Sequence, residues 1–212
     1  MSYPAAKRLI DVLVSAAALL LLSPLLLLLA VTVYLDNPGP VFYVHERVGR
    51  HGRPFPFYKF RTMVVGADRM GRGYEIERGD ARITRIGSFL RRWHLDELPQ
   101  LVNVLKGEMS IVGPRPTLSY QVEQYTDAQR RRLEALPGLT GLAQVSGLNA
   151  LTWQERIRLD VYYVDHASLR LDAWIMLATF GAIAAEDNTY GHGWESSHAS
   201  KGGHSERESI DG

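Results

Sequence analysis

Residues 95–116 read LDELPQLVNVLKGEMSIVGPRP. Four apolar side chains in this stretch recur at intervals of three, four and seven, which is the spacing of one helix face. They are Leu98, Leu101, Val102 and Leu105. Gly107 follows as the usual stop, so the pattern predicts a helix whose first turn carries Asp96 and Glu97.

Asp96 and Glu97 are the candidate catalytic residues. The N-terminus of a helix carries partial positive charge and unpaired N–H groups, so both carboxylates are expected to be ionised. An ionised carboxylate can bind a metal ion or act as a nucleophile. Because neighbours on a helix diverge by about 100°, the two side chains are expected to differ in role. Ordinary capping of a helix by acidic residues is the alternative.

Arg115 stands between Pro114 and Pro116. The fixed φ angles of the two prolines limit the local backbone, so the guanidinium would be aimed with little entropy left to lose. Such a side chain suits bidentate binding of a phosphate group. The alternative is a corner at the surface, which a Pro-Arg-Pro turn also suits.

Val41–Val48 and Phe55–Met63 are rich in β-branched and aromatic residues and flank a glycine-containing turn, so they predict a β-hairpin. In the second strand Lys59 and Arg61 alternate onto one face. Arg91 adds a cation just before the acidic pair. The alternative for these cations is a solvated face, where most lysines and arginines lie.

The segment Val12–Leu35 is an almost unbroken apolar run of 24 residues. A straight helix of that length spans about 36 Å, enough to cross a hydrocarbon core of about 30 Å. Pro24 lies at its middle, has no N–H for the carbonyl of Leu20, and is expected to kink the helix. The hydroxyl of Ser23 is available to satisfy the freed backbone group.

Two membrane topologies fit this segment: a kinked span, or a re-entrant helix broken at Ser23-Pro24 whose ends return to the same face. Lys7 and Arg8 precede the run, and further arginines follow it from Arg47 onward. Basic residues mark the cytoplasmic side, so basic flanks at both ends favour the re-entrant form. A signal peptide is discounted, because the run is too long and no small-residue cleavage pattern follows.

Composition predicts one domain after the membrane segment. We expect an α+β, mostly helical fold with a membrane helix in residues 1–36, a catalytic domain in 37–186 and a disordered tail in 187–212. The chain has no cysteine, which excludes disulfides and thiolate metal sites. A net charge of +1 does not indicate a nucleic-acid partner, and local arginine clusters fit phosphate or membrane lipid better.

The last third of this predicted domain is expected to be helical at Trp153–Asp165 and Leu169–Glu186. Trp174 in the second helix stands among leucines and other apolar residues. An amphipathic helix with tryptophan can lie in the headgroup plane of a membrane. The alternative is that this apolar stripe packs into the protein core.

These residues together resemble a known family, the small monotopic bacterial phosphoglycosyl transferases, also called bacterial sugar transferases. The resemblance covers nearly the whole chain, and its motifs occur in order. They are KRLID before the broken helix, YKFRTM at 58–63, ITRIGSFLRRW at 83–93, the stretch at 95–116, PGLTGLAQVSG at 137–147 and LDVYYVDHASLRLD at 159–172.

The resemblance implies transfer of a phosphosugar from a UDP-sugar to polyprenyl (undecaprenyl) phosphate, with release of UMP. It implies Asp96 as the nucleophile that forms a covalent phosphosugar intermediate and as a ligand of Mg2+, with Glu97 as its partner. It further implies that Lys59, Arg91 and Arg115 contact phosphate.

The same resemblance implies a re-entrant helix broken at Ser23 and Pro24, in the bacterial inner membrane with the active site on the cytosolic face. The product would initiate synthesis of a glycan such as an exopolysaccharide, capsule, O-antigen or glycoprotein. The sugar and the oligomeric state, including a homodimer, are left open.

Two positions depart from the family pattern. Leu148 stands where many members have arginine. His94 stands where serine or threonine usually caps the helix of the acidic pair, so the ring of His94 is one way to hold that helix start.

Two other functions stay open. One is a weakly active homologue that acts as a membrane scaffold in glycan assembly, and the other is a membrane phosphatase with water as acceptor.

Overall fold

The computed structural model describes residues 2–70, 79–147 and 150–184 of the 212-residue chain. The helices are α1 (Tyr3–Asp36), α2 (Arg85–Arg92), α3 (Leu101–Lys106), α4 (Ser119–Glu123), α5 (Asp127–Arg130), α6 (Leu142–Val145), α7 (Trp153–His166) and α8 (Leu169–Ala184). The strands are β1 (Phe42–Val48), β2 (Pro54–Phe60), β3 (Ser110–Val112) and β4 (Gly138–Thr140). Short 3-10 helices lie between them: η1 (Arg50–Gly52), η2 (Ala67–Arg69), η3 (Leu95–Gln100) and η4 (Arg131–Glu134). The mostly helical fold with a small hairpin is confirmed, and the predicted tail of residues 187–212 lies outside the described residues.

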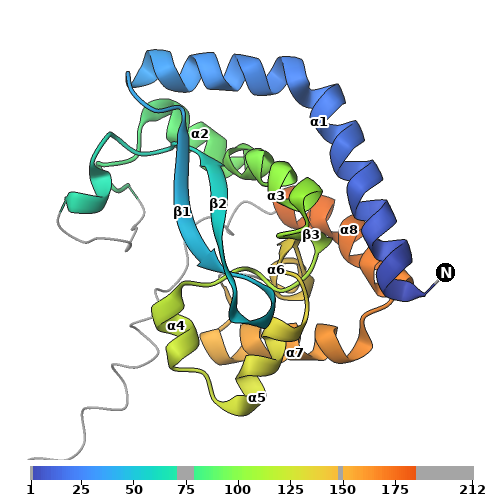
Figure 1. The fold of residues 1–212 in the computed structure, drawn as a ribbon. Coiled ribbons are helices and arrows are strands. Elements are labelled where there is room, and N and C mark those ends of the chain that lie inside the picture. The colour runs from blue at the N-terminus through green and yellow to red at the C-terminus, as the bar shows by residue number, and fades with distance from the viewer. Residues whose placement is uncertain (1, 71–78, 148–149, 185–212) are drawn as a thin grey trace, which may run out of the picture.

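Helix α1 is continuous through Pro24, and Figure 1 shows it bent into two arms along the outside of the molecule. The hydroxyl of Ser23 donates to the carbonyl oxygen of Leu20 at 2.8 Å. This is the carbonyl that Pro24 cannot pair, so the predicted role of the Ser23 hydroxyl is confirmed. Within the described residues, α1 is the one helix long and apolar enough by composition to cross a membrane, and only 11% of its most apolar window is buried.

Both arms of α1 are bonded to the same globular part of the chain. In the first arm, a carboxylate oxygen of Asp11 accepts a hydrogen bond of 2.9 Å from the backbone N–H of Ile111 in β3. At the other end, the carboxylate of Asp36 accepts one of 3.0 Å from the backbone N–H of Ile86 in α2. The two ends of this apolar helix therefore meet one body.

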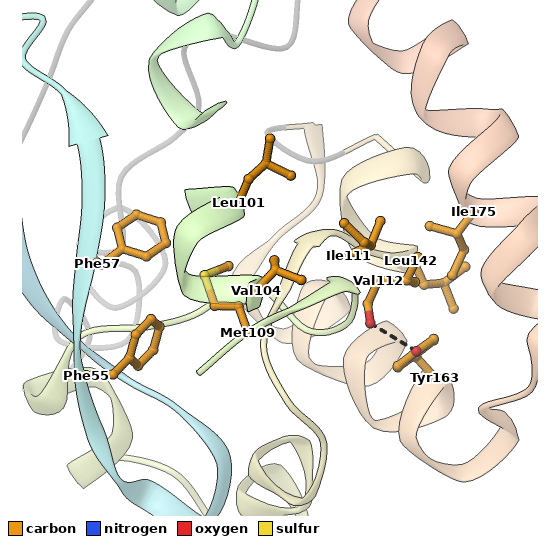
Figure 2. Close-up of a cluster of buried hydrophobic side chains, with 10 residues drawn as sticks. All are labelled: Phe55, Phe57, Leu101, Val104, Met109, Ile111, Val112, Leu142, Tyr163 and Ile175. Carbon is orange, nitrogen blue, oxygen red and sulfur yellow. Dashed lines mark hydrogen bonds between the residues drawn. The ribbon is translucent and has the colours of Figure 1, made fainter. Parts of the chain in front are cut away.

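Strands β1 and β2 form the predicted antiparallel hairpin, with Phe42 opposite Phe60 and Val48 opposite Pro54. The hairpin packs on the core through its phenylalanines. Figure 2 shows this core cluster, whose buried members are Phe55, Phe57, Leu101, Val104, Met109, Ile111, Val112, Leu142, Tyr163 and Ile175. The cluster joins the hairpin to α3, β3, α6, α7 and α8, so the hairpin lies against the element that follows the acidic pair.

The helix predicted to carry the acidic pair is in fact two helices. Residues 95–100 form the 3-10 helix η3, which contains Pro99, and α3 begins only at Leu101. A 3-10 helix has three residues per turn, so side-chain positions drift from those of a single α-helix. The prediction that Val102 lies on the buried apolar face is wrong, because its side chain is 37% exposed. Val104, which was not assigned to that face, is fully buried. The predicted stop is confirmed, since Gly107 has a φ of 81°.

The Pro-Arg-Pro turn follows a very close approach of two strands. Strands β3 and β4 are parallel, and the N–H of Gly138 donates to the carbonyl oxygen of Pro114 at 2.9 Å. A Cβ atom on Gly138 would lie 2.1 Å from the backbone nitrogen of Gly113, so only glycine fits there. The backbone pairing thus continues directly into the turn that carries Arg115.

The two C-terminal helices are confirmed as α7 and α8. The apolar side chains of α8 divide between two environments. Ile175 is fully buried in the core, whereas Trp174 is 53% exposed and Leu177 and Phe180 are also exposed. Helix α8 therefore packs into the core with one face and presents apolar side chains on another.

Candidate functional site

The two acidic residues lie in η3, packed against β2. Asp96 is 6% exposed and Glu97 is 7% exposed. The carboxylate of Glu97 accepts hydrogen bonds of 2.6 Å from Nζ of Lys59 and 2.6 Å from Nη2 of Arg115. The 3-10 helix, the second hairpin strand and the Pro-Arg-Pro turn thus bring together four of the residues that the sequence singled out.

Asp96 has a different environment from Glu97. Its nearest cation is Nζ of Lys59, 3.7 Å from a carboxylate oxygen, and the structure records no hydrogen bond to its side chain in the described part of the chain. Glu97 is therefore committed to two cations, whereas the buried carboxylate of Asp96 is available to a ligand or substrate. The two acids thus differ in their contacts, and the difference in role stays a prediction.

The two carboxyl groups also differ in their pKa. Burial raises the pKa of Asp96; the charge of Lys59 opposes this rise and that of Glu97 adds to it. Burial acts in the same direction on Glu97, but Arg115 and Lys59 more than offset it and keep its pKa well below the ordinary value. The helix terminus therefore does not act alone on the two acids, because burial opposes the charged form of Asp96 while two cations favour that of Glu97.

Arg91 lies at the C-terminal end of α2 and is not bonded to the acidic pair. Its Nε donates to the hydroxyl of Thr62 at 2.7 Å. Helix α2 begins with a cap, in which the side chain of Thr84 accepts a hydrogen bond of 2.9 Å from the N–H of Gly87. The charge of Arg91 nevertheless lowers the pKa of Asp96, whereas burial raises it. Arg91 therefore lies near Asp96.

Arg61, which the sequence placed beside Lys59 on one strand face, does not join the site. It follows the last residue of β2, is 7% exposed, and its guanidinium donates to the carbonyl oxygen of Asn37 after α1. This bond holds the chain at the end of α1 against the end of the hairpin.

The residues present fit a magnesium ion. The described residues contain no cluster of three or more potential metal ligands. Magnesium in phosphate-transfer sites usually has only one or two carboxylate ligands and takes the rest from substrate phosphates and water. Asp96 is the carboxylate that would hold such an ion, because no side chain in the described part of the chain donates a hydrogen bond to its oxygens.

His94 begins η3 in a left-handed backbone conformation, with φ 53° and ψ 20°. Its ring makes no capping hydrogen bond, so the expectation that the ring holds the helix start is wrong. Instead the backbone carbonyl of His94 accepts a hydrogen bond of 3.2 Å from the N–H of Glu97. The other departure from the family pattern, Leu148, lies outside the described residues.

Two arginines beside the site were not singled out by the sequence. Arg132 is buried and donates to the backbone carbonyl oxygen of Arg115 at 2.9 Å. Arg47 lies on β1 beside the Pro-Arg-Pro turn. The alternation of β1 and its register with β2 would have placed Arg47 on the same face as Lys59, but no sequence pattern brings Arg132 to the turn.

Comparison with known proteins places the chain in a family. The sequence profile described as bacterial sugar transferase matches residues 2–186. The chain therefore belongs to the bacterial sugar transferases and is an enzyme of the transferase class.

Several curated relatives match over most of this chain. The exopolysaccharide production protein ExoY of Sinorhizobium fredii is 41% identical over 198 residues, covering 87% of this chain and 88% of that protein. The UDP-glucose:undecaprenyl-phosphate glucose-1-phosphate transferase of Caulobacter vibrioides is 42% identical over 192 residues, covering 87% and 72%. The undecaprenyl-phosphate galactose phosphotransferase of Salmonella typhimurium is 42% identical over 198 residues, covering 87% of this chain but 41% of that longer protein.

Proposed function

We propose that this chain is a phosphoglycosyl transferase that moves a phosphosugar from a UDP-sugar to undecaprenyl phosphate and releases UMP. The observation that carries this proposal is the contrast within the acidic pair. Glu97 binds Lys59 and Arg115, while no described residue donates a hydrogen bond to the neighbouring carboxylate of Asp96. The names of the relatives from Caulobacter and Salmonella describe sugar-phosphate transfer to the same carrier and support this substrate class.

The reaction proceeds in two displacements at one phosphorus atom. In the first, a carboxylate oxygen of Asp96 attacks the β-phosphorus of the UDP-sugar, an O–P bond forms, and the P–O bond to UMP breaks. In the second, a phosphate oxygen of the lipid carrier attacks the same phosphorus and the bond to Asp96 breaks. The carboxylate is restored and the phosphosugar remains on the lipid as a diphosphate.

The chain's own cations make this attack feasible. A carboxylate approaches a diphosphate only if the negative charge of the diphosphate is offset. Lys59 and Arg115 are fixed beside Asp96 by their bonds to Glu97, so they need little reorganisation to contact the phosphate oxygens. Asp96 would hold Mg2+, which would supply further charge neutralisation at the diphosphate.

The bent helix α1 supports a re-entrant membrane anchor. Asp11 and Asp36, near its two ends, are bonded to one globular part, and that part cannot lie on both sides of a bilayer. Lys7 and Arg8 before the apolar run favour the cytosolic side. In this proposal the site faces the cytosol at the inner membrane, where the phosphate of the carrier meets Asp96, and the lipid product initiates an exopolysaccharide or a related glycan.

The test is UMP release by the full chain in nanodiscs with Mg2+, undecaprenyl phosphate and a panel of UDP-sugars. We expect lipid-dependent UMP from one or a few sugars and its loss in Asp96→Asn. The matched control is Asp127→Asn, an exposed acid in the first turn of α5 that should keep full activity.

Each alternative predicts a different result in the same assay. A phosphatase would release free sugar phosphate without the lipid. A scaffold would be folded but would release no UMP from any UDP-sugar. Asp96→Asn would then leave its assembly with the other proteins of glycan synthesis unchanged. Either result would overturn the proposed transfer.

A further inference from the structure

Arg47 has no part in the reaction described above, yet it lies on the face of the hairpin that meets the acidic pair. The strand register places Arg47 directly opposite Phe55. Residues directly opposite each other share a face of the sheet, and so do residues at even spacing along one strand. Phe55 and Lys59 are four residues apart, so Arg47 shares its face with Lys59, which contacts Glu97.

The side chain of Arg47 is fixed within this face. Its Nε donates a hydrogen bond of 2.6 Å to Nε2 of His45. Its guanidinium carbon lies 5.7 Å from the ring centroid of Phe57, and Nζ of Lys59 lies 5.4 Å from the same centroid. Among the described residues the structure records no ion pair for Arg47, so its charge has no carboxylate partner there.

Arg47 also lies next to the Pro-Arg-Pro turn. The N–H of the adjacent Val48 donates to the carbonyl oxygen of Thr117 at 2.9 Å, two residues beyond Arg115. Burial, followed by the charge of Arg115, lowers the pKa of Arg47 to about 10. Arg47 is therefore still charged at neutral pH, and it adds a second cation beside Arg115, which is itself paired with Glu97.

We propose that Arg47 binds the phosphate that leaves with the nucleoside, and that His45 holds its guanidinium for this contact. This inference rests on the proposed function. In phosphoryl transfer the attacking and leaving oxygens lie on opposite sides of the reacting phosphorus. Lys59 lies beside the nucleophile Asp96, whereas Arg47, opposite Phe55, lies four residues further along this face and next to the turn that carries Arg115. Arg47 is thus further along this face from the nucleophile than Lys59, and this is where the proposal places the leaving phosphate.

His45 is suited to orient Arg47. Burial, followed by the charges of Arg47 and Lys59, lowers the pKa of the ring to about 3. The ring is therefore uncharged at neutral pH, and its Nε2 keeps the lone pair that accepts the hydrogen bond from Arg47. A protonated ring would repel the guanidinium instead.

The test measures UMP and uridine binding to the full chain in nanodiscs, without lipid carrier or sugar donor. We expect Arg47→Gln to raise the dissociation constant of UMP about 10- to 100-fold, the usual effect of losing a hydrogen bond to a charged group, and to leave uridine binding unchanged. The control is Arg50→Gln, an exposed arginine of the hairpin turn, which should bind UMP like the wild type. Should Arg47→Gln fail to fold, Arg47→Lys carries the test, because it keeps the charge but loses the bond to His45.

Equal UMP affinity in Arg47→Gln and Arg50→Gln would overturn the inference, as would absence of UMP binding in the wild type. Equal losses of UMP and uridine would show that Arg47 supports the shape of the site rather than contacting phosphate. If the wild type binds UMP through Arg47 but releases no UMP from any UDP-sugar, the proposed transfer fails while the anion site remains.

Discussion

Nη2 of Arg132 donates a hydrogen bond of 2.9 Å to the backbone carbonyl oxygen of Arg115. Arg132 is only 4% exposed, donates to the hydroxyl of Tyr125 at 2.5 Å and forms an ion pair with Asp160 of α7. The flanking prolines limit the backbone of the Arg115 turn, but they do not determine where that turn lies relative to the acidic pair. The buried guanidinium contributes to this placement, because it bonds the turn to α7.

We expect Arg132→Lys to lower the free energy of unfolding by about 1–3 kcal/mol, since an ammonium group cannot make all three contacts at once. Because Arg115 would be displaced, the KM for the UDP-sugar should rise. Thermal unfolding and UMP release measure the two effects. Arg131→Lys is the control, because its partner Asp165 is exposed and such pairs contribute at most about 1 kcal/mol. Arg132→Lys behaving like this control in both measurements would contradict the positioning role.

The re-entrant anchor predicts that both ends of α1 lie on the same side of the membrane. The chain has no cysteine, so single cysteines can be labelled without background. We expect Ser2→Cys before the helix and Arg50→Cys after it to react with a membrane-impermeant thiol reagent only in inverted vesicles. Labelling of the two positions from opposite sides would show that α1 spans the bilayer.

The buried position of His45 predicts that the free energy of unfolding depends on pH. Its pKa is lowered by burial, and then by Arg47 and Lys59, to about 3. In the unfolded chain the ring protonates near pH 6.5, so His45 contributes stability that is complete above that pH and is lost progressively as the pH falls toward 3.

We therefore expect the wild type to lose about 1–2 kcal/mol more unfolding free energy than His45→Gln between about pH 7.5 and about pH 5. The amide oxygen of glutamine can still accept the hydrogen bond from Arg47, but it does not titrate in this range. Denaturation of both proteins in the same detergent at several pH values measures the difference. Parallel pH profiles would contradict the buried neutral state of His45.

The left-handed backbone of His94 predicts strain at the start of η3, the 3-10 helix that carries Asp96 and Glu97. In the described residues the non-glycine positions with positive φ are His51, at 57°, and His94, at 53°. A β-branched residue in this conformation costs about 1–2 kcal/mol, so both His51→Val and His94→Val should lower the unfolding temperature. Only His94→Val should also slow UMP release, because η3 carries Asp96 and Glu97. Equal UMP release by the two variants would show that the backbone of His94 does not position the acidic pair.

Several predictions from the sequence are confirmed because each depends on neighbouring residues alone. The bond from Ser23 to Leu20 follows from the N–H that Pro24 lacks. The stop at Gly107 follows from the freedom of glycine to adopt positive φ. Such local rules also sufficed for the hairpin and for the helices α7 and α8.

The wrong predictions share a different cause. Val102 was assigned to the buried face by assuming one α-helix, whereas Pro99 lies in a 3-10 helix that shifts the angular positions. The helix-terminus argument treated Asp96 and Glu97 alike, whereas burial raises the pKa of Asp96 and two distant cations keep that of Glu97 low. Neither 3-10 geometry nor burial can be derived from the spacing of the residues concerned.

The residue types at the site, their order along the chain and the elements that carry them follow from the amino-acid sequence, because they depend on local conformational preferences. The division of labour between Asp96 and Glu97 depends on the tertiary structure. Lys59 and Arg115, which lie 38 and 18 positions from Glu97 in the sequence, donate hydrogen bonds to its carboxylate. Asp96 receives none from the described residues and has only the more distant charge of Lys59 at 3.7 Å. Packing decides this outcome, because the energy of a buried charge depends on which distant groups come within a few ångströms of it.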